Sequence, residues 1–409
     1  MELLKVDSVE QALDKLAACM AGWPLEAGRV PLEAAQGLPL AQDVHTEEDI
    51  PGFARSTVDG YAVLAKDTAA ATDSIPVFLK VAGKVEMGRL AGMTLTAGQC
   101  AAVPTGGMLP AGADAVVMVE YTEPFGASGM ALSQSVAPGE NVVQRGEDAA
   151  KGALLLPRGR RIGPAETGAL AAAGVVRVPV YKPLRLAVLS TGDELVPPGQ
   201  VPGPGQVRDI NTHALVALAR KNGFEVAHTA VLRDDEALLE AELRRAAHTC
   251  DIVAVSGGSS QGEKDATRAV IDRVASPGVF THGLALKPGK PTILGVDDAS
   301  RTLFAGLPGH PVSAMMVFEL LFCRLWRRLT GTPEAPAIPA ALAANVAASP
   351  GKLTSWPVRL EAGDTGYRAR PIYGKSGLIT TLAGADGYFT IPRNAEGLPA
   401  GSLVWVQLF

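Results

Sequence analysis

The chain has 409 residues, of which 47% are hydrophobic and 19% charged, and its formal net charge is −5. A chain of this length is expected to form several domains, because single cores stop growing at roughly 250–300 residues. The near balance of 37 basic and 42 acidic residues leaves no basic surface for nucleic acid. The four cysteines are far apart and form no CxxC pair, which favours a reduced, cytoplasmic protein without disulfides or a zinc knuckle.

The predicted secondary structure changes twice within the first 180 residues. Ser8 and Gln11 form a capping-box pattern, which predicts a helix that runs to about Met20 and ends at Gly22. From about residue 47 to 140, short apolar runs cut by Gly and Pro predict a small all-β unit. Helical and extended patterns return over 141–180, with a helix expected at 164–173. We therefore expect the β domain 47–140 to be inserted into an elongated α/β domain built from 1–46 and 141–180.

Strand and helix patterns alternate between residues 181 and 331. Strands are expected at 184–189, 224–232, 251–255, around 279–286 and at 302–305, and helices at 212–221 (capped by Asn211), 236–247 and near 265–274. Such alternation predicts βαβ units and a mostly parallel, Rossmann-like sheet. Residues 311–329 are apolar but carry four charges, so they should form a buried helix and not a membrane span. After a proline-rich link, residues 332–409 predict a C-terminal β domain, which makes the chain an α/β multidomain protein.

Three turns that contain glycine, most of them with serine or threonine as well, follow three of these strands. They contain Ser190, Thr191 and Gly192; then Ser256, Gly257, Gly258 and Ser260; and then Pro308, Gly309 and Pro311. Ligands of open α/β sheets bind outside the carboxyl ends of the strands, so these turns should converge on one crevice. Backbone N–H groups and hydroxyls beside a helix N-terminus suit phosphate. One such loop would be an ordinary strand-to-helix turn, whereas three favour a binding site.

Carboxylates accompany the same strand ends. Glu194, Asp234 and Asp265 follow the first, second and third strands of the series. Each alone could be a solvated surface group, and Asp265 could equally cap a helix. Carboxylates would repel an anionic ligand unless a hard cation bridged them, and Mg²⁺ is typically held by carboxylates and substrate phosphates. The three residues are therefore predicted metal ligands.

Two lysines lie close together in the segment Lys287-Pro288-Gly289-Lys290-Pro291. A solvated turn is the ordinary interpretation. Here two prolines restrict the backbone, so we expect both ammonium groups to lie in a narrow arc that suits an anion.

Two generic signals are set aside. Residues 258–262 match the G-x-S-x-G pattern of serine hydrolases, but the helical pattern does not begin directly after Ser260, as that motif requires. The six histidines lack the close spacing of a zinc site.

In order, these motifs resemble those of the molybdopterin molybdenumtransferase family, whose eukaryotic relatives include the C-terminal domain of gephyrin. The resemblance covers essentially the whole chain. It is carried by residues 56–62, 105–114, 139–141 with 145–148, 190–195, 257–265, 287–291 and 306–311. Any one segment is a weak signal, whereas seven in the right order are specific.

The resemblance implies four domains, with a molybdopterin-binding Rossmann-like catalytic domain at 181–331, and a homodimer whose active site is completed by the partner subunit. The implied reaction inserts molybdate into the dithiolene of adenylylated molybdopterin and releases AMP with Mg²⁺. By motif position, Glu194, Asp234 and Asp265 should position metal and ligand, and Asp59 and Asp148 should act across the dimer. Lys287 and Lys290 should bind phosphate or molybdate. Pocket-shaping residues should be Thr105, Ser260, Pro308 and Pro311, with Ser376 reaching in from the C-terminal domain.

The chain departs from the family pattern at three places. His310 stands where Asn is usual, Gln261 stands where a small apolar residue is common, and the functional arginine of the last domain has no clear counterpart in residues 351–359. Two other functions stay open: a molybdopterin adenylyltransferase, and a gephyrin-like interaction scaffold without catalysis. Transient contacts with a molybdopterin adenylyltransferase and with apo-molybdoenzymes are also expected. Molybdate and tungstate are not distinguished.

Overall fold

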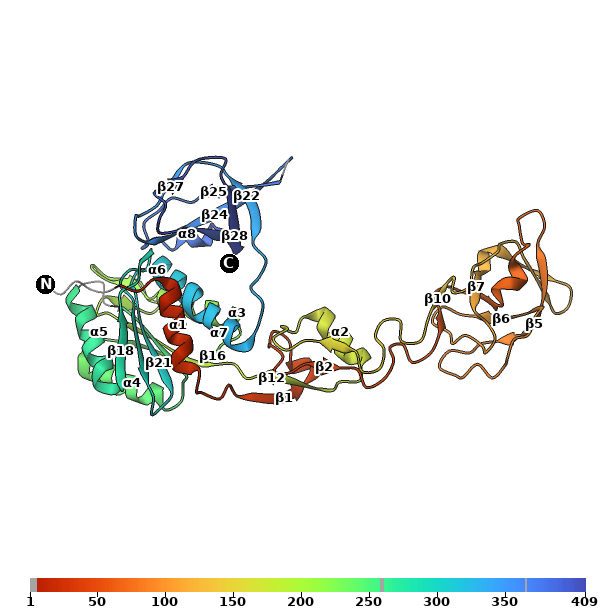
Figure 1. The fold of residues 1–409 in the computed structure, drawn as a ribbon. Coiled ribbons are helices and arrows are strands. Elements are labelled where there is room, and N and C mark those ends of the chain that lie inside the picture. The colour runs from red at the N-terminus through yellow and green to blue at the C-terminus, as the bar shows by residue number, and fades with distance from the viewer. Residues whose placement is uncertain (1–5, 258–260, 365) are drawn as a thin grey trace.

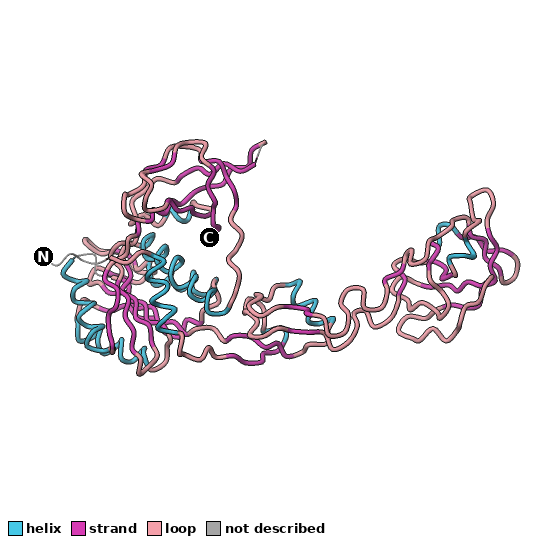
Figure 2. Tube along the Cα trace, in the orientation of Figure 1, coloured by secondary structure: helices cyan, strands magenta, loops and turns pink. Residues whose placement is uncertain are grey.

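The computed structural model describes residues 6–257, 261–364 and 366–409, and the side chains of all of these except 261–265. The molecule is elongated (Figure 1): an α/β unit and a C-terminal β unit lie at one end, and a small β unit lies at the other. A narrow middle segment of short strands and one helix connects them (Figure 2).

Helix α1 (Val9–Met20) packs on the α/β unit, although it lies in the stretch 1–46 that we assigned to the elongated domain. Its capping box is present: the Gln11 N–H donates to Ser8 Oγ, and the Ser8 N–H donates to Gln11 Oε1. Val9, Leu13, Leu16 and Met20 form its buried stripe. The physical reason for its placement is this apolar stripe, which is buried in one hydrophobic cluster with residues of the α/β unit such as Leu186 and Leu321.

The middle segment is built from pairs of strands far apart in sequence. β1 (Ala27–Pro31) pairs with β12 (Arg177–Tyr181), and β2 (Val44–His45) pairs with β11 (Leu154–Leu156), all antiparallel. Helix α2 (Pro164–Ala172) and the turn Leu32–Ala34 cover a small core that contains Leu40, Ile162 and Leu170. β3 (Arg55–Ser56) and β10 (Val142–Val143) lead into the distal β unit.

The distal β unit is a six-stranded sheet in the order β7-β4-β6-β5-β9-β8. Its strands are β4 (Gly60–Val63), β5 (Val77–Lys84), β6 (Gln99–Val103), β7 (Ala115–Met118), β8 (Thr122–Phe125) and β9 (Gly129–Leu132). Separate hydrophobic clusters contain Val63 and Val117 in one case and Ala62 and Val116 in the other. Successive side chains of a strand point to opposite faces, which explains why neighbours belong to different clusters.

The sheet of the α/β unit has the order β16-β13-β17-β21-β20-β18. Its strands are β13 (Arg185–Thr191), β16 (Glu225–Leu232), β17 (Ile252–Ser256), β18 (Pro277–His282), β20 (Ile293–Asp297) and β21 (Thr302–Leu307). The first four in the sheet are parallel, and β20 is antiparallel to both neighbours. β20 was not predicted, and the single strand expected around 279–286 is in fact β18 followed by the separate short strand β19 (Leu286–Lys287).

Helices cover both faces of this sheet. On one face lie α1, α3 (Asn211–Lys221), α6 (Pro311–Phe318), the π-helical segment Glu319–Cys323 and α7 (Arg324–Thr330). On the other lie α4 (Glu236–Ala247) and α5 (Gln261–Val274). The start of α5 was expected near 265, but the helix begins directly after Ser260, so the ground on which the G-x-S-x-G pattern was set aside is wrong. Because both faces are covered, the central strands read as continuous apolar runs. Within the described residues, no helix has the length and apolar character needed to cross a membrane.

The C-terminal β unit contains six strands in the order β19-β24-β25-β22-β28-β26, with β24 also paired to β26. They include β22 (Ile338–Leu342), β24 (Leu353–Gly363), β25 (Gly366–Pro371), β26 (Gly387–Ile391) and β28 (Leu403–Leu408), beside the short pair β23 (Val346–Ala347) and β27 (Gly397–Leu398) and helix α8 (Thr380–Ala383). Strand β19 comes from the α/β unit, and Lys287 lies in register with Thr354 of β24. This parallel pairing joins the two units at Lys287, where residues 287–291, here called the lysine turn, begin.

Candidate functional site

The turns after β13, β17 and β21 lie side by side at one edge of the sheet. Ser190 is in register with Ser256, and Ser256 with Leu307, so the three strands end at the same level. A side chain at Gly257 would place its Cβ 2.0 Å from Thr191 Oγ1, which shows how closely the first two turns approach. A Cβ at Gly309 would lie 3.7 Å from the Gly257 carbonyl carbon. The three turns therefore form one edge; Gly258 and Ser260 lie outside the described residues.

The N-terminus of α3 is hydrogen-bonded to these turns. Ser190 Oγ lies 2.8 Å from Thr212 Oγ1, and the Thr212 N–H donates to Asp209 Oδ1. Asn211 Nδ2 donates to Ser256 Oγ (2.7 Å) and to the Gly309 carbonyl (2.8 Å). The predicted helix cap at Asn211 is wrong, because Asp209 accepts the N–H and Asn211 instead connects two strand ends. Among the described residues, the buried Asn211 Oδ1 has no hydrogen-bond partner.

Two of the three predicted metal ligands lie on neighbouring turns. Glu194 follows β13 and Asp234 follows the adjacent β16, and both are exposed. Asp234 Oδ2 accepts from the Asp193 N–H at 3.3 Å, while Asp193 Oδ1 faces the Asp234 N–H at 3.4 Å. The side chain of Asp265 lies outside the described residues. The described part of the chain contains no group of three His, Cys, Asp or Glu residues placed to hold a metal ion.

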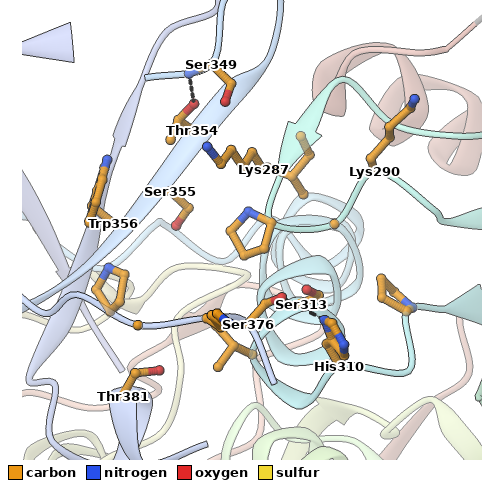
Figure 3. A pocket seen from close by; sticks show the side chains of 18 of the residues that line it. Lys287, Lys290, His310, Ser313, Ser349, Thr354, Ser355, Trp356, Ser376 and Thr381 are labelled. Carbon is orange, nitrogen blue, oxygen red and sulfur yellow. Dashed lines mark hydrogen bonds between the residues drawn. The ribbon is translucent and has the colours of Figure 1, made fainter. Parts of the chain in front are cut away.

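A cavity of about 810 Å³ lies between the α/β unit and the C-terminal β unit (Figure 3). Four of the residues that line it are lysines: Lys287, Lys290, Lys352 and Lys375. Within the part of the chain that the structure describes, its lining contains no Asp or Glu, and none of these lysines forms an ion pair. Ammonium groups without carboxylate partners make this a positively charged pocket.

The lysine turn is held by its packing on α6. A Cβ at Gly289 would lie 2.7 Å from Val317 and 2.8 Å from Leu286 side-chain carbons, so the turn lies directly on the helix. Lys287 extends toward Ser349 and Thr354 of the C-terminal unit, whereas Lys290 points to the other side of the turn (Figure 3). The two side chains diverge and do not share the narrow arc that we expected.

Uncharged residues from both units complete the pocket. They include Pro308, Gly309 and Trp356, and the hydroxyl residues Ser313, Ser349, Thr354, Ser355 and Ser376. Ser376 accepts a hydrogen bond at its carbonyl from the Val312 N–H (3.2 Å), and its Oγ lies 2.8 Å from His310 Nδ1. Pro311 is the buried first residue of α6, directly after His310.

The remaining predicted residues lie outside this pocket. Asp59 Oδ1 accepts from the Thr105 N–H at 2.7 Å and faces the Thr105 hydroxyl at 3.1 Å, both in the distal β unit. Asp148 is exposed, and its N–H donates to the Ile50 carbonyl in the segment that leads to that unit. Within one chain, the distal β unit stands at the opposite end of the molecule from the α/β unit (Figure 1).

Lys352, Lys375 and Trp356 are among the residues that line the pocket but were not predicted from the sequence. Lys352 lies in the segment 351–359, where the family has a functional arginine. The lysine after Gly351 could have been identified there as an alternative cation. Arg359 of the same segment is exposed and contacts the Gly384 carbonyl at 3.4 Å, outside the pocket lining.

Comparisons with known proteins match this architecture over its length. Three family models fit in chain order: "MoeA N-terminal region (domain I and II)" over residues 7–174, "Probable molybdopterin binding domain" over 187–328, and "MoeA C-terminal region (domain IV)" over 339–409. Molybdopterin molybdenumtransferase 2 of Mycobacterium tuberculosis is 36% identical over 385 residues, which cover 92% of this chain and 94% of that protein. The chain belongs to the molybdopterin molybdenumtransferase family.

Other members give the same result. The molybdopterin molybdenumtransferase of Bacillus subtilis is 31% identical over 389 residues, covering 90% of this chain and 86% of that protein. A molybdopterin biosynthesis MoeA protein of Pyrococcus horikoshii has 37% identity and a TM-score of 0.77, with 99% of each chain covered. A second structure from that organism has 30% identity and a TM-score of 0.83, covering 99% of this chain and 100% of the other. This family member is a transferase of molybdenum cofactor biosynthesis.

Proposed function

We propose that this transferase inserts molybdate into the dithiolene of adenylylated molybdopterin and releases AMP. The observation that carries the proposal is the polarity of the crevice: a lysine pocket whose described lining has no carboxylate lies at one end, and exposed carboxylates lie at the other. Asp234 follows β16, and the lysine pocket adjoins the turn after β21. These two strands are three positions apart in the sheet, and three inter-strand spacings of about 4.8 Å span roughly 14 Å. An elongated ligand with two anionic groups suits such an interval.

The lysine pocket suits the oxyanion. Molybdate is a tetrahedral dianion, and Lys287 and Lys352 can donate to it from the two units while hydroxyls such as Ser376 complete its hydrogen bonds. Lys290 lines the same cavity from the other side of the turn, where it can contact the anionic part of the pterin substrate. The four lysines have no carboxylate partner among the described residues, so they repel one another, and binding of an anion relieves this repulsion.

The carboxylate end suits Mg²⁺ and the phosphate–AMP group. Exposed carboxylates on adjacent turns match the preference of Mg²⁺ for one or two carboxylates together with phosphate and water, so Glu194 and Asp234, with Asp265, would hold it. When bound, Mg²⁺ would neutralise charge on the phosphate oxygens as the bond to AMP breaks. The backbone N–H groups of the turns that contain Thr191 and Gly257 would orient the phosphate.

We further propose that the enzyme acts as a cytoplasmic homodimer. Asp59, Thr105 and Asp148 are too distant along the molecule to reach the crevice of their own chain, so a second copy would have to bring them there. The domain limits 1–46 with 141–180, 47–140, 181–331 and 332–409 also remain proposals, with α1 packed on the third unit.

Reconstitution tests the reaction. Purified protein, adenylylated molybdopterin, Mg²⁺ and molybdate should release AMP and activate an apo-molybdoenzyme, and Lys287→Ala should raise the molybdate requirement. Lys80→Ala, which alters an exposed lysine of the distal sheet, is the matched control and should leave that requirement unchanged. AMP release that does not depend on molybdate would contradict the proposal, and consumption of ATP without molybdate would favour the adenylyltransferase alternative.

A further inference from the structure

The cavity between the α/β unit and the C-terminal unit is far larger than the oxyanion proposed for it. A tetrahedral anion with four oxygens takes roughly the space of four water molecules, or about 120 Å³ at about 30 Å³ each. The cavity measures about 810 Å³. A volume of that size is typical of pockets that enclose an organic ligand. Room for the organic part of a substrate therefore remains beside the lysines.

The C-terminal unit gives this space a wall of uncharged side chains. They include Trp356, Pro357 and Ile372. Thr354 lies in register with Lys287, and Trp356 follows two residues later on the same face of β24, about 7 Å farther along. In Figure 3, Trp356 lies on the side of Lys287 that faces away from Lys290. An anion held by Lys287 and a flat ring placed against Trp356 would therefore be close neighbours.

Contacts away from the cavity hold the half-buried indole of Trp356 in place. Its Nε1 donates to the Ala347 carbonyl at 3.1 Å, and Ala347 lies outside the described lining of the cavity. The ring of Tyr373 meets the indole edge to face, with centroids 5.4 Å apart and an interplanar angle of 73°. The indole has one polar atom, and that atom is already hydrogen-bonded. What Trp356 offers to a ligand is therefore a fixed aromatic carbon surface.

We propose that Trp356 is the stacking platform for the pterin ring of the substrate. The inference rests on the proposed function. In adenylylated molybdopterin the dithiolene adjoins the fused pterin rings, whereas the adenine lies beyond the phosphate groups. With the dithiolene at the lysines and the phosphate–AMP group toward Glu194 and Asp234, the pterin is the flat ring that reaches the C-terminal unit. It is planar and uncharged at neutral pH, so stacking on an indole suits it better than contact with an ammonium group.

Equilibrium dialysis of the full chain tests the platform with three probes: 6-hydroxymethylpterin, AMP and sulfate. Removal of an aromatic partner from a stacked base typically lowers affinity by roughly one to two orders of magnitude. Trp356→Ala should therefore bind 6-hydroxymethylpterin about 10- to 100-fold more weakly than the wild type, with unchanged affinity for AMP and sulfate. Trp356→Phe keeps an aromatic ring and should stay within about five-fold of the wild type.

Trp405→Ala is the matched control. Trp405 is an exposed tryptophan on β28 of the same unit, outside the described lining of the cavity. Its replacement should leave the binding of all three probes unchanged. Thermal unfolding and unchanged sulfate affinity check that the pocket of Trp356→Ala is intact, and Trp356→Phe provides a second variant that preserves the packing of the indole site.

The outcomes separate this inference from the proposed function. Equal pterin affinity of wild type and Trp356→Ala, or no pterin binding by the wild type, would overturn the platform. Loss of AMP affinity with pterin affinity retained would assign Trp356 to the adenine instead, and an equal loss in Trp405→Ala would show that the effect is not local. If pterin binding depends on Trp356 but AMP release does not depend on molybdate, the platform stands and the proposed reaction is refuted.

Discussion

Replacement of Lys352 by alanine isolates the contribution of the C-terminal unit to oxyanion binding. Lys352 is half-buried, it lines the cavity, and it forms no ion pair with a described residue. A hydrogen bond to a charged partner typically contributes roughly 1.5–3 kcal/mol, and each 1.4 kcal/mol is about a factor of ten in affinity. We therefore expect Lys352→Ala to raise the molybdate concentration for half-maximal AMP release about 10- to 100-fold.

Two variants control for this result. Lys352→Arg keeps a cation at the same position and should retain an affinity within about three-fold of the wild type, because guanidinium also binds oxyanions. Arg359→Ala removes the exposed arginine of β24, the strand that begins directly after Lys352, and should leave molybdate dependence unchanged. The stability of the unliganded protein should change by less than about 1 kcal/mol in Lys352→Ala, since a repelling cation is lost with little packing. A large effect of Arg359→Ala with none for Lys352→Ala would refute the reasoning.

Three further variants address other parts of the molecule. Gly257→Ala should lower the free energy of unfolding by about 1–3 kcal/mol in urea titrations, because its Cβ would overlap Thr191; Gly168→Ala, with open space around it, is the control, and equal stabilities would contradict the close approach. Asp265→Ala should abolish AMP release at saturating Mg²⁺ but leave the mass measured by sedimentation unchanged. The control Asp73→Ala should change neither AMP release nor mass. Wild-type turnover by Asp265→Ala would remove Asp265 from the mechanism. Hydrogen bonds from Arg160 above all, together with those from backbone N–H groups, lower the pKa of Glu166, so this carboxylate stabilises the fold at neutral pH and loses that effect as the pH falls below its ordinary value of 4.5. Glu166→Gln should therefore unfold at lower temperature than the wild type at pH 7, and the difference should shrink as the pH falls below 4.5; a difference in unfolding temperature that does not change with pH would count against this assignment.

Local patterns predicted much of the architecture because their causes are local. The capping box and apolar stripe of α1 lie within one short stretch, so the helix could be predicted from residues 8–20 alone. The continuous apolar runs of β13, β17 and β21 predicted a sheet that is covered on both faces. Parallel strands share one carboxyl edge, and for that reason the meeting of the turns at Ser190, Ser256 and Gly309 was predictable without coordinates.

Contacts between distant segments were decided only by the tertiary structure. The sequence shows that Lys287 and Lys352 are cations, but β20, β21, α6 and α7 separate them along the chain. They come together because β19 pairs with β24. It shows that α1 is amphipathic, but not that the α/β unit would cover its stripe. It likewise contains His310 and Ser376 without indicating that they are hydrogen-bonded. Side-chain type and periodicity are properties of the chain itself, whereas which cation, helix or hydroxyl lies opposite which depends on how separate units pack.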